Sequence, residues 1–380
     1  MSAFLVTNIL GSQDFDDCEP KCSLNGQCID GMCFCKYPYA GEICNERQEI
    51  EFKFTTIQLA AAMMVSLAIG IMISLCLKLT IDQICYRRGS DELSQNSDRM
   101  TINGIKAKVL ILQLHPVHKD IQKSMKKADQ LLDDYELKDN IDILILSEMV
   151  FTGYKFTDKA DIEPYCEVAG EGPTYEWCKK QALKLNCWVF CGYPEKIGSA
   201  LYNSQMVISP EGNYVKSYKK HFLYETDKTW SSEGPGFDTL DLKLPRSDHV
   251  IKVGHGICMD INPWEFKSDF EKMEFANFHK DNDVQLIVFS SAWLDPNSYP
   301  TDQKATNETI NYWANRLIPI LDDKKNRKPC YFLCSNRVGN ELGESYMGSS
   351  CILMLKPQIG VIKNLSRKEQ NTICETLNLS

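Results

Sequence analysis

Residues 108–147, KVLILQLHPVHKDIQKSMKKADQLLDDYELKDNIDILILS, contain two short apolar runs on either side of an amphipathic stretch. The runs at 108–114 and 141–147 are rich in Val, Ile and Leu, which is typical of buried strands. The stretch between them, 119–137, has the apolar spacing of a helix. This alternation indicates an α/β domain whose sheets are covered by helices.

The same pattern continues along the chain to about residue 366. A second amphipathic stretch predicts a helix over 173–186, and further apolar runs predict strands at 187–194, 202–209, 249–259, 284–293, 329–336 and 349–355. We therefore expect one α/β domain over 105–366, followed by a C-terminal tail over 367–380. Roughly 260 residues are ample for a hydrophobic core.

The composition of the chain argues against nucleic-acid binding and against a dedicated metal site. The chain has 380 residues and a formal net charge of −9, so no broad basic surface indicates nucleic-acid binding. Its six histidines form no zinc-binding pattern, so we expect no dedicated metal site.

Six cysteines lie close together before the α/β domain, which is typical of a domain too small for a core of its own. The segment CFCKYPYAGEIC, residues 33–44, resembles the end of an EGF-like module, which we expect over 18–44 after a tail at 1–17. A zinc cluster is the alternative, but the stretch contains no histidine. The resemblance implies the disulfides Cys18–Cys28, Cys22–Cys33 and Cys35–Cys44, although six cysteines allow fifteen pairings.

A long uncharged segment follows the cysteine-rich stretch. Residues 54–77, FTTIQLAAAMMVSLAIGIMISLCL, are 24 residues without a charge, long enough to span a bilayer as a helix. A buried core helix is the alternative, but few core helices stay uncharged over this length. We therefore predict a single transmembrane helix, followed by a polar linker over 78–104, and the lipid bilayer as a partner.

The charges beside this segment predict its orientation. Lys78, Arg87 and Arg88 follow it against the single acid Asp82, which places the C-terminal side in the cytosol. Disulfides require an oxidising compartment, so the EGF-like module is expected to be extracellular or lumenal. No cleavable signal peptide is visible, so either the helix itself acts as a reverse anchor or the sequence lacks its original start. The partner of the EGF-like module is not indicated.

Three residues in separate segments of the α/β domain are candidates for catalysis. Cys258 follows an apolar strand in HGICMDINPWEF, where a turn exposes a thiol to substrate. Glu148 ends the strand at 141–147, where a buried carboxylate must be paired or catalytic. Lys220 follows a predicted hairpin at Glu211-Gly212. Taken singly, Glu148 is explained equally well by a structural ion pair, whereas a lone cysteine is more often a small buried hydrophobe and a lone lysine is usually a solvated surface charge.

Together these segments resemble the nitrilase superfamily, whose site is a Glu–Lys–Cys triad in this chain order. Supporting motifs are LILQLHP (110–116), AGEGPTYEW (169–177), LYNSQMVISPEGNYVKSYKKHFL (201–223) and CSNRVGNELGESYMGSSCIL (334–353). The resemblance covers about residues 105–365. It implies an α-β-β-α sandwich, catalysis through a cysteine thioester, and neither metal nor organic cofactor. Relatives often dimerise, so a homodimer is an expected assembly.

Within the superfamily, EMVFTGYKF, FLYETDKTW, HGICMDINPWEF and SSAWL look like the protein N-terminal asparagine/glutamine amidohydrolase branch. That branch converts N-terminal Asn or Gln to Asp or Glu and so creates a degradation signal. The substrate implied is therefore a protein or peptide N-terminus. The chain departs from the family in two places. Ser147 stands where relatives have Pro, and Phe222 stands where many have His, with His221 beside it.

The resemblance also implies roles for individual residues. Cys258 is the expected nucleophile, Glu148 the general base and acid, and Lys220 the stabiliser of the oxyanion, with the Met259 amide as a second donor. Relatives often carry a further acid after the lysine, for which Glu233 and then Glu225 are the candidates. The candidate contacts with the substrate are Asp260, Asp227 and Trp293. The two aspartates, with Glu225 as a third acid, are candidates for binding the α-ammonium of the substrate.

Two other functions remain open from the sequence. The domain could be an amidase of the same superfamily that acts on a small-molecule amide. It could also be a catalytically inactive scaffold behind an EGF-bearing membrane receptor, although inactive relatives normally lose a member of the triad.

Overall fold

The computed structural model describes residues 26–29, 32–35, 39–40, 46–47, 104–321, 323 and 328–380. In the cysteine-rich stretch, β1 (Gly26–Ile29) pairs antiparallel with β2 (Met32–Cys35), and β3 (Tyr39–Ala40) pairs with β4 (Glu46–Arg47). The predicted tail, transmembrane segment and almost all of the linker lie outside the described residues. Within the described part of the chain, no helix is long and apolar enough to cross a membrane.

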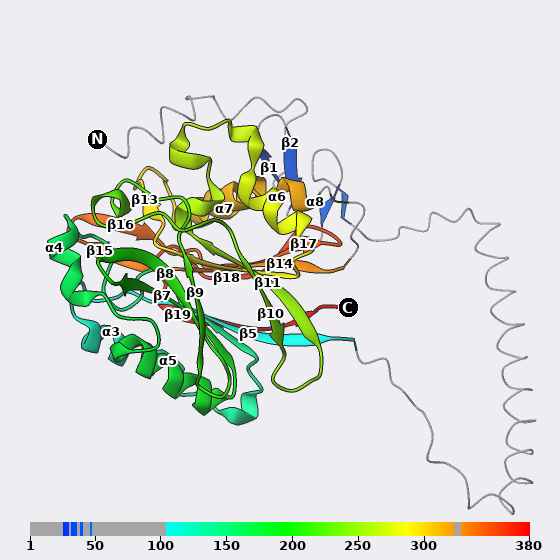
Figure 1. Cartoon of the computed structure of the whole chain (residues 1–380). Coiled ribbons are helices and arrows are strands. Elements are labelled where there is room, and N and C mark those ends of the chain that lie inside the picture. The colour runs from blue at the N-terminus through cyan, green and yellow to red at the C-terminus, as the bar shows by residue number, and fades with distance from the viewer. Residues whose placement is uncertain are drawn as a thin grey trace, which may run out of the picture.

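Two six-stranded sheets form the centre of the α/β domain (Figure 1). In spatial order, the first sheet consists of β19 (Asn371–Asn378), β5 (Lys106–Gln113), β6 (Ile143–Ile145), β7 (Trp188–Ile197), β8 (Ala200–Ile208) and β9 (Tyr214–Lys219). The second consists of β10 (Thr239–Lys243), β11 (Val250–Ile257), β12 (Leu286–Ser291), β14 (Cys330–Asn336), β17 (Cys351–Lys356) and β18 (Gly360–Asn364).

Helices cover the outer face of each sheet, and short elements connect the layers. The α-helices are α3 (Ile121–Leu132), α4 (Lys159–Ile162), α5 (Gly172–Leu185), α6 (Glu274–Asp281), α7 (Asp302–Asn315) and α8 (Ile318–Leu321). A small sheet contains β13 (Leu294–Asp295), β16 (Glu344–Met347) and β15 (Val338–Glu341). The 3-10 turns are η1 (Leu137–Asp139), η2 (Glu163–Tyr165), η3 (Asp227–Thr229), η4 (Cys258–Ile261), η5 (Trp264–Phe266) and η6 (Phe270–Lys272).

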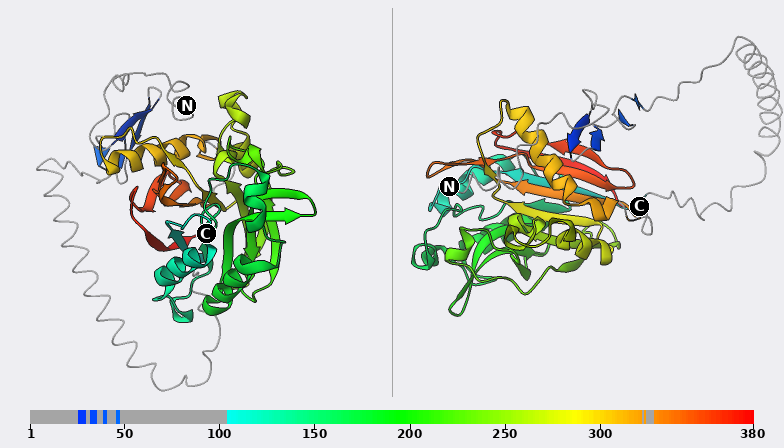
Figure 2. Two further views of the ribbon diagram at one scale, coloured as in Figure 1. Left: turned by 90° about the vertical axis from the view of Figure 1, so that its left-hand side faces the viewer. Right: turned by 90° about the horizontal axis from the view of Figure 1, so that it is seen from above.

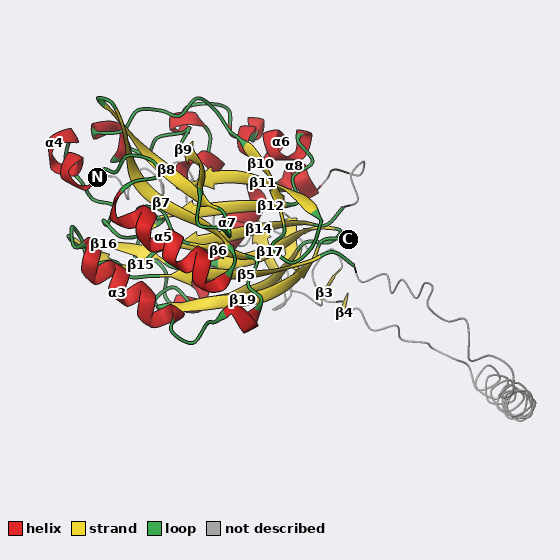
Figure 3. Cartoon of the chain, turned by 60° about the horizontal axis from the view of Figure 1, so that its bottom comes forward, coloured by secondary structure: helices red, strands yellow, loops and turns green. Residues whose placement is uncertain are grey.

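Strand alternation produces three apolar layers, because successive side chains point to opposite faces of a sheet. On β5, Val109 and Ile111 pack between the two sheets, whereas Leu110 and Leu112 pack against α3 and α5. The second sheet packs in the same way against α6, α7 and α8, with Trp313 fully buried. The sheets lie face to face with helices outside them (Figures 2 and 3), so the expected α-β-β-α sandwich is confirmed.

The prediction of a C-terminal tail over 367–380 is wrong. Residues 371–378 form β19, which pairs antiparallel with β5 along its whole length, from Asn371 opposite Gln113 to Asn378 opposite Lys106. Ile373 and Leu377 are buried between the sheets, while polar residues alternate with them. The apolar residues fall at every second or fourth position, and this sparse pattern hid the strand. The sandwich therefore extends to the end of the chain.

The topology gathers several strand ends at one edge. Strands β5, β6 and β7 are parallel to one another, as are β11, β12 and β14. Strand β8 is antiparallel to both β7 and β9, so β9 runs in the same direction as β7. Ligand sites in α/β folds form at the carboxyl ends of such strands. Glu148 follows β6, Lys220 follows β9 and Cys258 follows β11, so all three candidates lie at this edge.

Candidate active site

Glu148 is fully buried and held by three hydrogen bonds. Its Oε1 accepts from Lys220 Nζ at 2.6 Å and from Asn203 Nδ2 at 2.8 Å, and its Oε2 accepts from the Ala292 amide at 2.7 Å. Burial raises the pKa of this carboxyl; the Lys220 charge lowers it and the Asp227 charge raises it further. A carboxylate whose pKa is raised in this way is suited to taking up and returning a proton.

Close approach of β7 fixes the backbone beside Glu148. A Cβ at Gly192 would lie 2.4 Å from the Ser147 carbonyl oxygen and 2.6 Å from the Glu148 Cα, so only glycine fits there. Ser147, which stands where relatives have Pro, is buried, and its hydroxyl has no hydrogen-bond partner among the described residues. The departure therefore lies directly against the candidate base.

Lys220 lies between two carboxylates. Its Nζ donates to Glu148 Oε1 and to Asp227 Oδ2, both at 2.6 Å, and its side chain is fully buried. Burial lowers the pKa of this ammonium, but the charges of Asp227 and Glu148 outweigh that effect and raise the pKa above its ordinary value. The lysine is therefore a permanent positive charge at the site.

Asp227 holds this lysine, and its geometry does not match the expected contact with a substrate ammonium. Its Oδ1 accepts from Asn203 Nδ2 at 3.0 Å, and its Oδ2 accepts from Lys220 and from the Tyr224 amide at 3.0 Å. Both oxygens already accept hydrogen bonds from protein donors, and the side chain is fully buried. The sequence placed the further acid at Glu233 or Glu225, but the acid that contacts Lys220 is Asp227.

Cys258 is the first residue of the η4 turn. Its φ is +44°, an unusual conformation for a residue with a side chain, and 8% of the residue is exposed. Burial and the Glu148 charge raise the pKa of its thiol, while Lys220, the Ser291 hydroxyl and the Ala292 amide lower it. A sulfur so placed can become a nucleophile once a base removes its proton.

Asp260 also has a different environment from the one expected. Its Oδ1 accepts from the amides of His221 and Phe222 at 3.0 and 2.8 Å, and its Oδ2 accepts from the Ile257 amide and the Tyr218 hydroxyl, both at 2.8 Å. These bonds tie the cysteine turn to the segment that follows Lys220. Its buried carboxylate therefore aligns two parts of the site, which argues against contact with a substrate ammonium.

The remaining predicted residues lie around this centre. Trp293 packs against the apolar cluster of Tyr218, Ile257 and Cys258 and stays partly exposed, so it can still contact substrate. Met259 follows Cys258 within the turn. Glu225 is exposed, and Glu233 accepts a hydrogen bond from Trp264 Nε1 at 3.1 Å. Neither glutamate contacts Lys220 in a described interaction.

Sequence reasoning missed three parts of the site. The Asn203 amide joins Glu148 to Asp227, the Ala292 amide binds Glu148, and Tyr154 places its ring 5.6 Å from Lys220 Nζ. Asn203 could have been noticed as the first of three consecutive polar residues, followed by Ser204 and Gln205, between the apolar ends of a strand. The Ala292 contribution carries no signal, because a backbone amide is present at every non-proline position.

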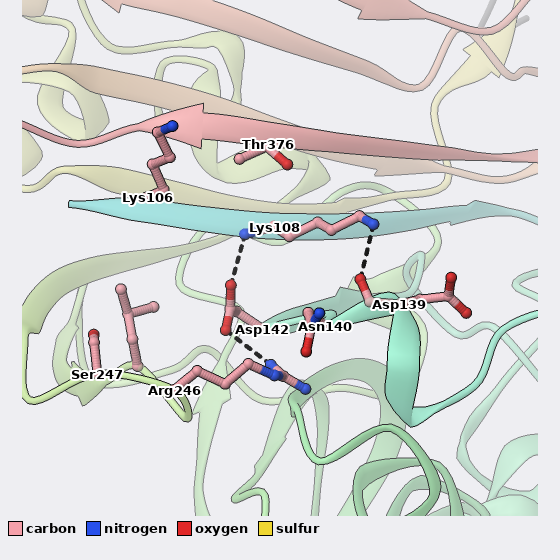
Figure 4. Close-up of a pocket in the computed structure, with 9 residues that line it drawn as sticks. Lys106, Lys108, Asp139, Asn140, Asp142, Arg246, Ser247 and Thr376 are labelled. Carbon is pink, nitrogen blue, oxygen red and sulfur yellow. Dashed lines mark hydrogen bonds and ion pairs between the residues drawn. The ribbon is translucent and has the colours of Figure 1, made fainter. Parts of the chain in front are cut away.

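A cavity of about 330 Å³ lies at the opposite end of the strands (Figure 4). Its lining consists of Lys106, Lys108, Asp139, Asn140, Asp142, Leu244, Arg246, Ser247 and Thr376. Within it, Asp142 accepts hydrogen bonds from the Lys108 amide at 2.7 Å and from Arg246 at 2.9 Å. It begins where β5 and β6 begin, whereas Glu148 follows the end of β6. The cavity is therefore separate from the triad.

The sandwich and the buried Glu–Lys–Cys cluster define a class of enzymes that hydrolyse carbon–nitrogen bonds. The carbon-nitrogen hydrolase family model matches residues 108–305, and the chain belongs to this family. A Teneurin-like EGF domain model matches residues 18–47, in agreement with the expected EGF-like module.

Curated relatives narrow the comparison. A "Protein N-terminal amidase" of Schizosaccharomyces pombe is 31% identical over 281 residues, which cover 69% of this chain and 96% of the relative. A protein of the same name from Saccharomyces cerevisiae is 34% identical over 223 residues, which cover 54% of this chain and 49% of the relative.

A solved structure shares the fold. The crystal structure of an N-terminal amidase with an Asn-Glu-Ala peptide has a TM-score of 0.65 and 23% identity, and the match covers 73% of this chain and 98% of that chain.

Proposed function

We propose that this chain removes the side-chain amide of N-terminal Asn or Gln in proteins or peptides, which leaves Asp or Glu and releases ammonia. The match to a protein N-terminal amidase over nearly that relative's whole length carries the proposal. The buried Glu148, Lys220 and Cys258 cluster supports it, because it contains the groups that amide hydrolysis through a thioester requires.

In the proposed first step, the Cys258 sulfur attacks the carboxamide carbon and its proton passes to Glu148. The positive charge of Lys220 stabilises the oxyanion that forms, and the Met259 amide is the second candidate donor. Glu148 then returns the proton to the departing nitrogen, the carbon–nitrogen bond breaks, and ammonia leaves behind a thioester.

In the second step, Glu148 takes a proton from water, whose oxygen attacks the thioester carbon. The carbon–sulfur bond breaks, Glu148 gives its proton to the departing sulfur to restore the thiol, and the carboxylic acid product is released. One carboxylate therefore serves both halves of the reaction, which agrees with the three hydrogen bonds that fix its position.

We also propose that the hydrolase domain works on the cytosolic side of a membrane, with the EGF-like module on the other side. The charges around residues 54–77 and the match to an EGF-like domain support this arrangement. The substrates would then be protein or peptide N-termini in the cytosol.

The test is release of ammonia by the full chain from peptides that begin with Asn, Gln or N-acetyl-Asn. We expect release from the free Asn and Gln termini only, because the site must recognise the α-ammonium beside the carboxamide. Cys258→Ala should abolish it. Equal release from the acetylated peptide would contradict an N-terminal amidase. No release from any peptide, with Cys258 reactive toward a thiol probe, would point to a small-molecule amide.

The charge of Asp227 should be visible in the pH dependence. Glu148 must be ionised to take the thiol proton, so kcat/KM falls as the pH drops through its pKa. Asp227 raises that pKa. Asp227→Asn removes the charge and should shift the acidic limb of the kcat/KM profile to lower pH by about one unit. A limb that stays in place or moves upward would contradict this account.

A further inference from the structure

Ser291 is a buried residue of the active-site edge that the proposed reaction does not yet use. It is the last residue of β12, its side chain is fully buried, and its hydroxyl has no hydrogen-bond partner among the described residues. The preceding Ser290 differs, because its hydroxyl donates to the Leu146 carbonyl at 2.7 Å and accepts from Gln205 at 2.8 Å. A buried hydroxyl without a partner is costly and calls for an explanation.

The position of Ser291 beside Cys258 follows from strand pairing. In the parallel pair β11 and β12, Ile257 lies opposite Ser290, so the next residues, Cys258 and Ser291, are neighbours at the strand ends. The following amide, that of Ala292, donates to Glu148 Oε2 at 2.7 Å. Consecutive residues of one strand end therefore adjoin the candidate nucleophile and the candidate base.

The surroundings of Cys258 disfavour the negatively charged thiolate form of its side chain. Burial raises the pKa of Cys258, and Glu148 raises it further, whereas the nearby Ser291 hydroxyl lowers it. Lys220 also lowers it, but its ammonium already donates to two carboxylates at 2.6 Å each. Ser291 is thus a neighbouring side-chain donor that has no other described partner.

We propose that Ser291 is a further catalytic residue, whose hydroxyl donates a hydrogen bond to the Cys258 sulfur as the thiol proton passes to Glu148. The serine forms no covalent bond and keeps its own proton. The hydroxyl has no other acceptor among the described residues, and a thiolate accepts a hydrogen bond more strongly than a thiol, so the interaction strengthens as charge forms on the sulfur. Interactions of that kind accelerate a reaction. The inference rests on the proposed nucleophilic role of Cys258.

The experiment measures the rate at which iodoacetamide alkylates Cys258 in the full chain as a function of pH, by mass spectrometry of the peptide that contains this residue. In Ser291→Ala the midpoint of the alkylation profile should rise by about one pH unit, with about a tenfold slower reaction at neutral pH. Ser291→Thr keeps a hydroxyl and should restore the native midpoint. With Asn-initiated peptides, kcat/KM should fall about tenfold in Ser291→Ala.

Ser335→Ala is the matched control, because this buried hydroxyl of the neighbouring strand β14 donates to the Leu112 carbonyl at 2.7 Å. It should change stability but not the midpoint. If Ser291→Ala does not fold, Ser291→Gly removes the same hydroxyl. A folded variant without the hydroxyl that keeps the native midpoint overturns the proposal. Alkylation needs no substrate, so a failed peptide assay would refute the proposed function without deciding the role of Ser291.

Discussion

Glu148→Gln is expected to reduce the kcat for ammonia release about 10⁴-fold. The amide keeps the shape of the side chain but can neither take the thiol proton nor return it to the leaving nitrogen. Peptide binding should change much less, because the surrounding groups remain in place. Steady-state release from an Asn-initiated peptide gives kcat, and calorimetry on the inactive variant gives the Kd.

Glu195→Gln is the control for this change. Glu195 is also a buried carboxylate of the first sheet, and it accepts from Ser204 Oγ at 2.7 Å, but it lies outside the triad. This variant should lose some stability and retain catalysis. If Glu148→Gln kept activity close to that of Glu195→Gln, another group would have to be the base.

Lys220→Met should have the second large effect, on both activity and folding. Glu148 and Asp227 are fully buried and share this one ammonium at 2.6 Å. Without it, two buried carboxylates lack a counter-charge, which costs about 3–5 kcal/mol of unfolding free energy. Loss of the charge that faces the oxyanion should also lower kcat about 10³-fold. Urea unfolding and the peptide assay measure the two effects.

The effects of Lys220→Met on stability and on activity can be separated. Adding Asp227→Asn to Lys220→Met removes one unpaired charge, so stability should recover in part while activity does not. Burial raises the pKa of Glu148 and the Lys220 charge lowers it, so in Lys220→Met the pKa of Glu148 lies further above its unfolded value and the stability of this variant should improve as the pH falls. Lys219→Met is the control, since that side chain is 23% exposed and lies 3.6 Å from Glu195. A Lys220→Met variant as stable as Lys219→Met would contradict the charge argument.

Much of the fold could be predicted from the chain because burial leaves a pattern in the sequence. The eight predicted strands coincide with β5, β6, β7, β8, β11, β12, β14 and β17, and the two predicted helices with α3 and α5. Strands with few apolar positions were not predicted, and β19 is the clearest example. Its partner β5 lies more than 250 residues earlier, so no local signal indicated the pairing.

The residues of the candidate site also fall into those that could be predicted from the sequence and those that could not. Glu148, Lys220 and Cys258 could be selected from the sequence, because each follows an apolar strand or a hairpin and stands in a motif of known order. The acids around them could not be sorted. Asp227, Asp260, Glu225 and Glu233 are alike in composition and local setting, yet one pairs with the lysine, one ties two segments together and two lie outside the centre.

The sequence by itself determined the α/β class, the order of the three candidate residues and the family resemblance, because these depend on residue type and local spacing. Only the tertiary structure decided which carboxylate holds Lys220, which backbone amide binds Glu148 and which hydroxyl lies beside Cys258. Those relations depend on distances of a few ångströms between strands that are far apart in the chain. Such distances are set by the packing and register of the two sheets.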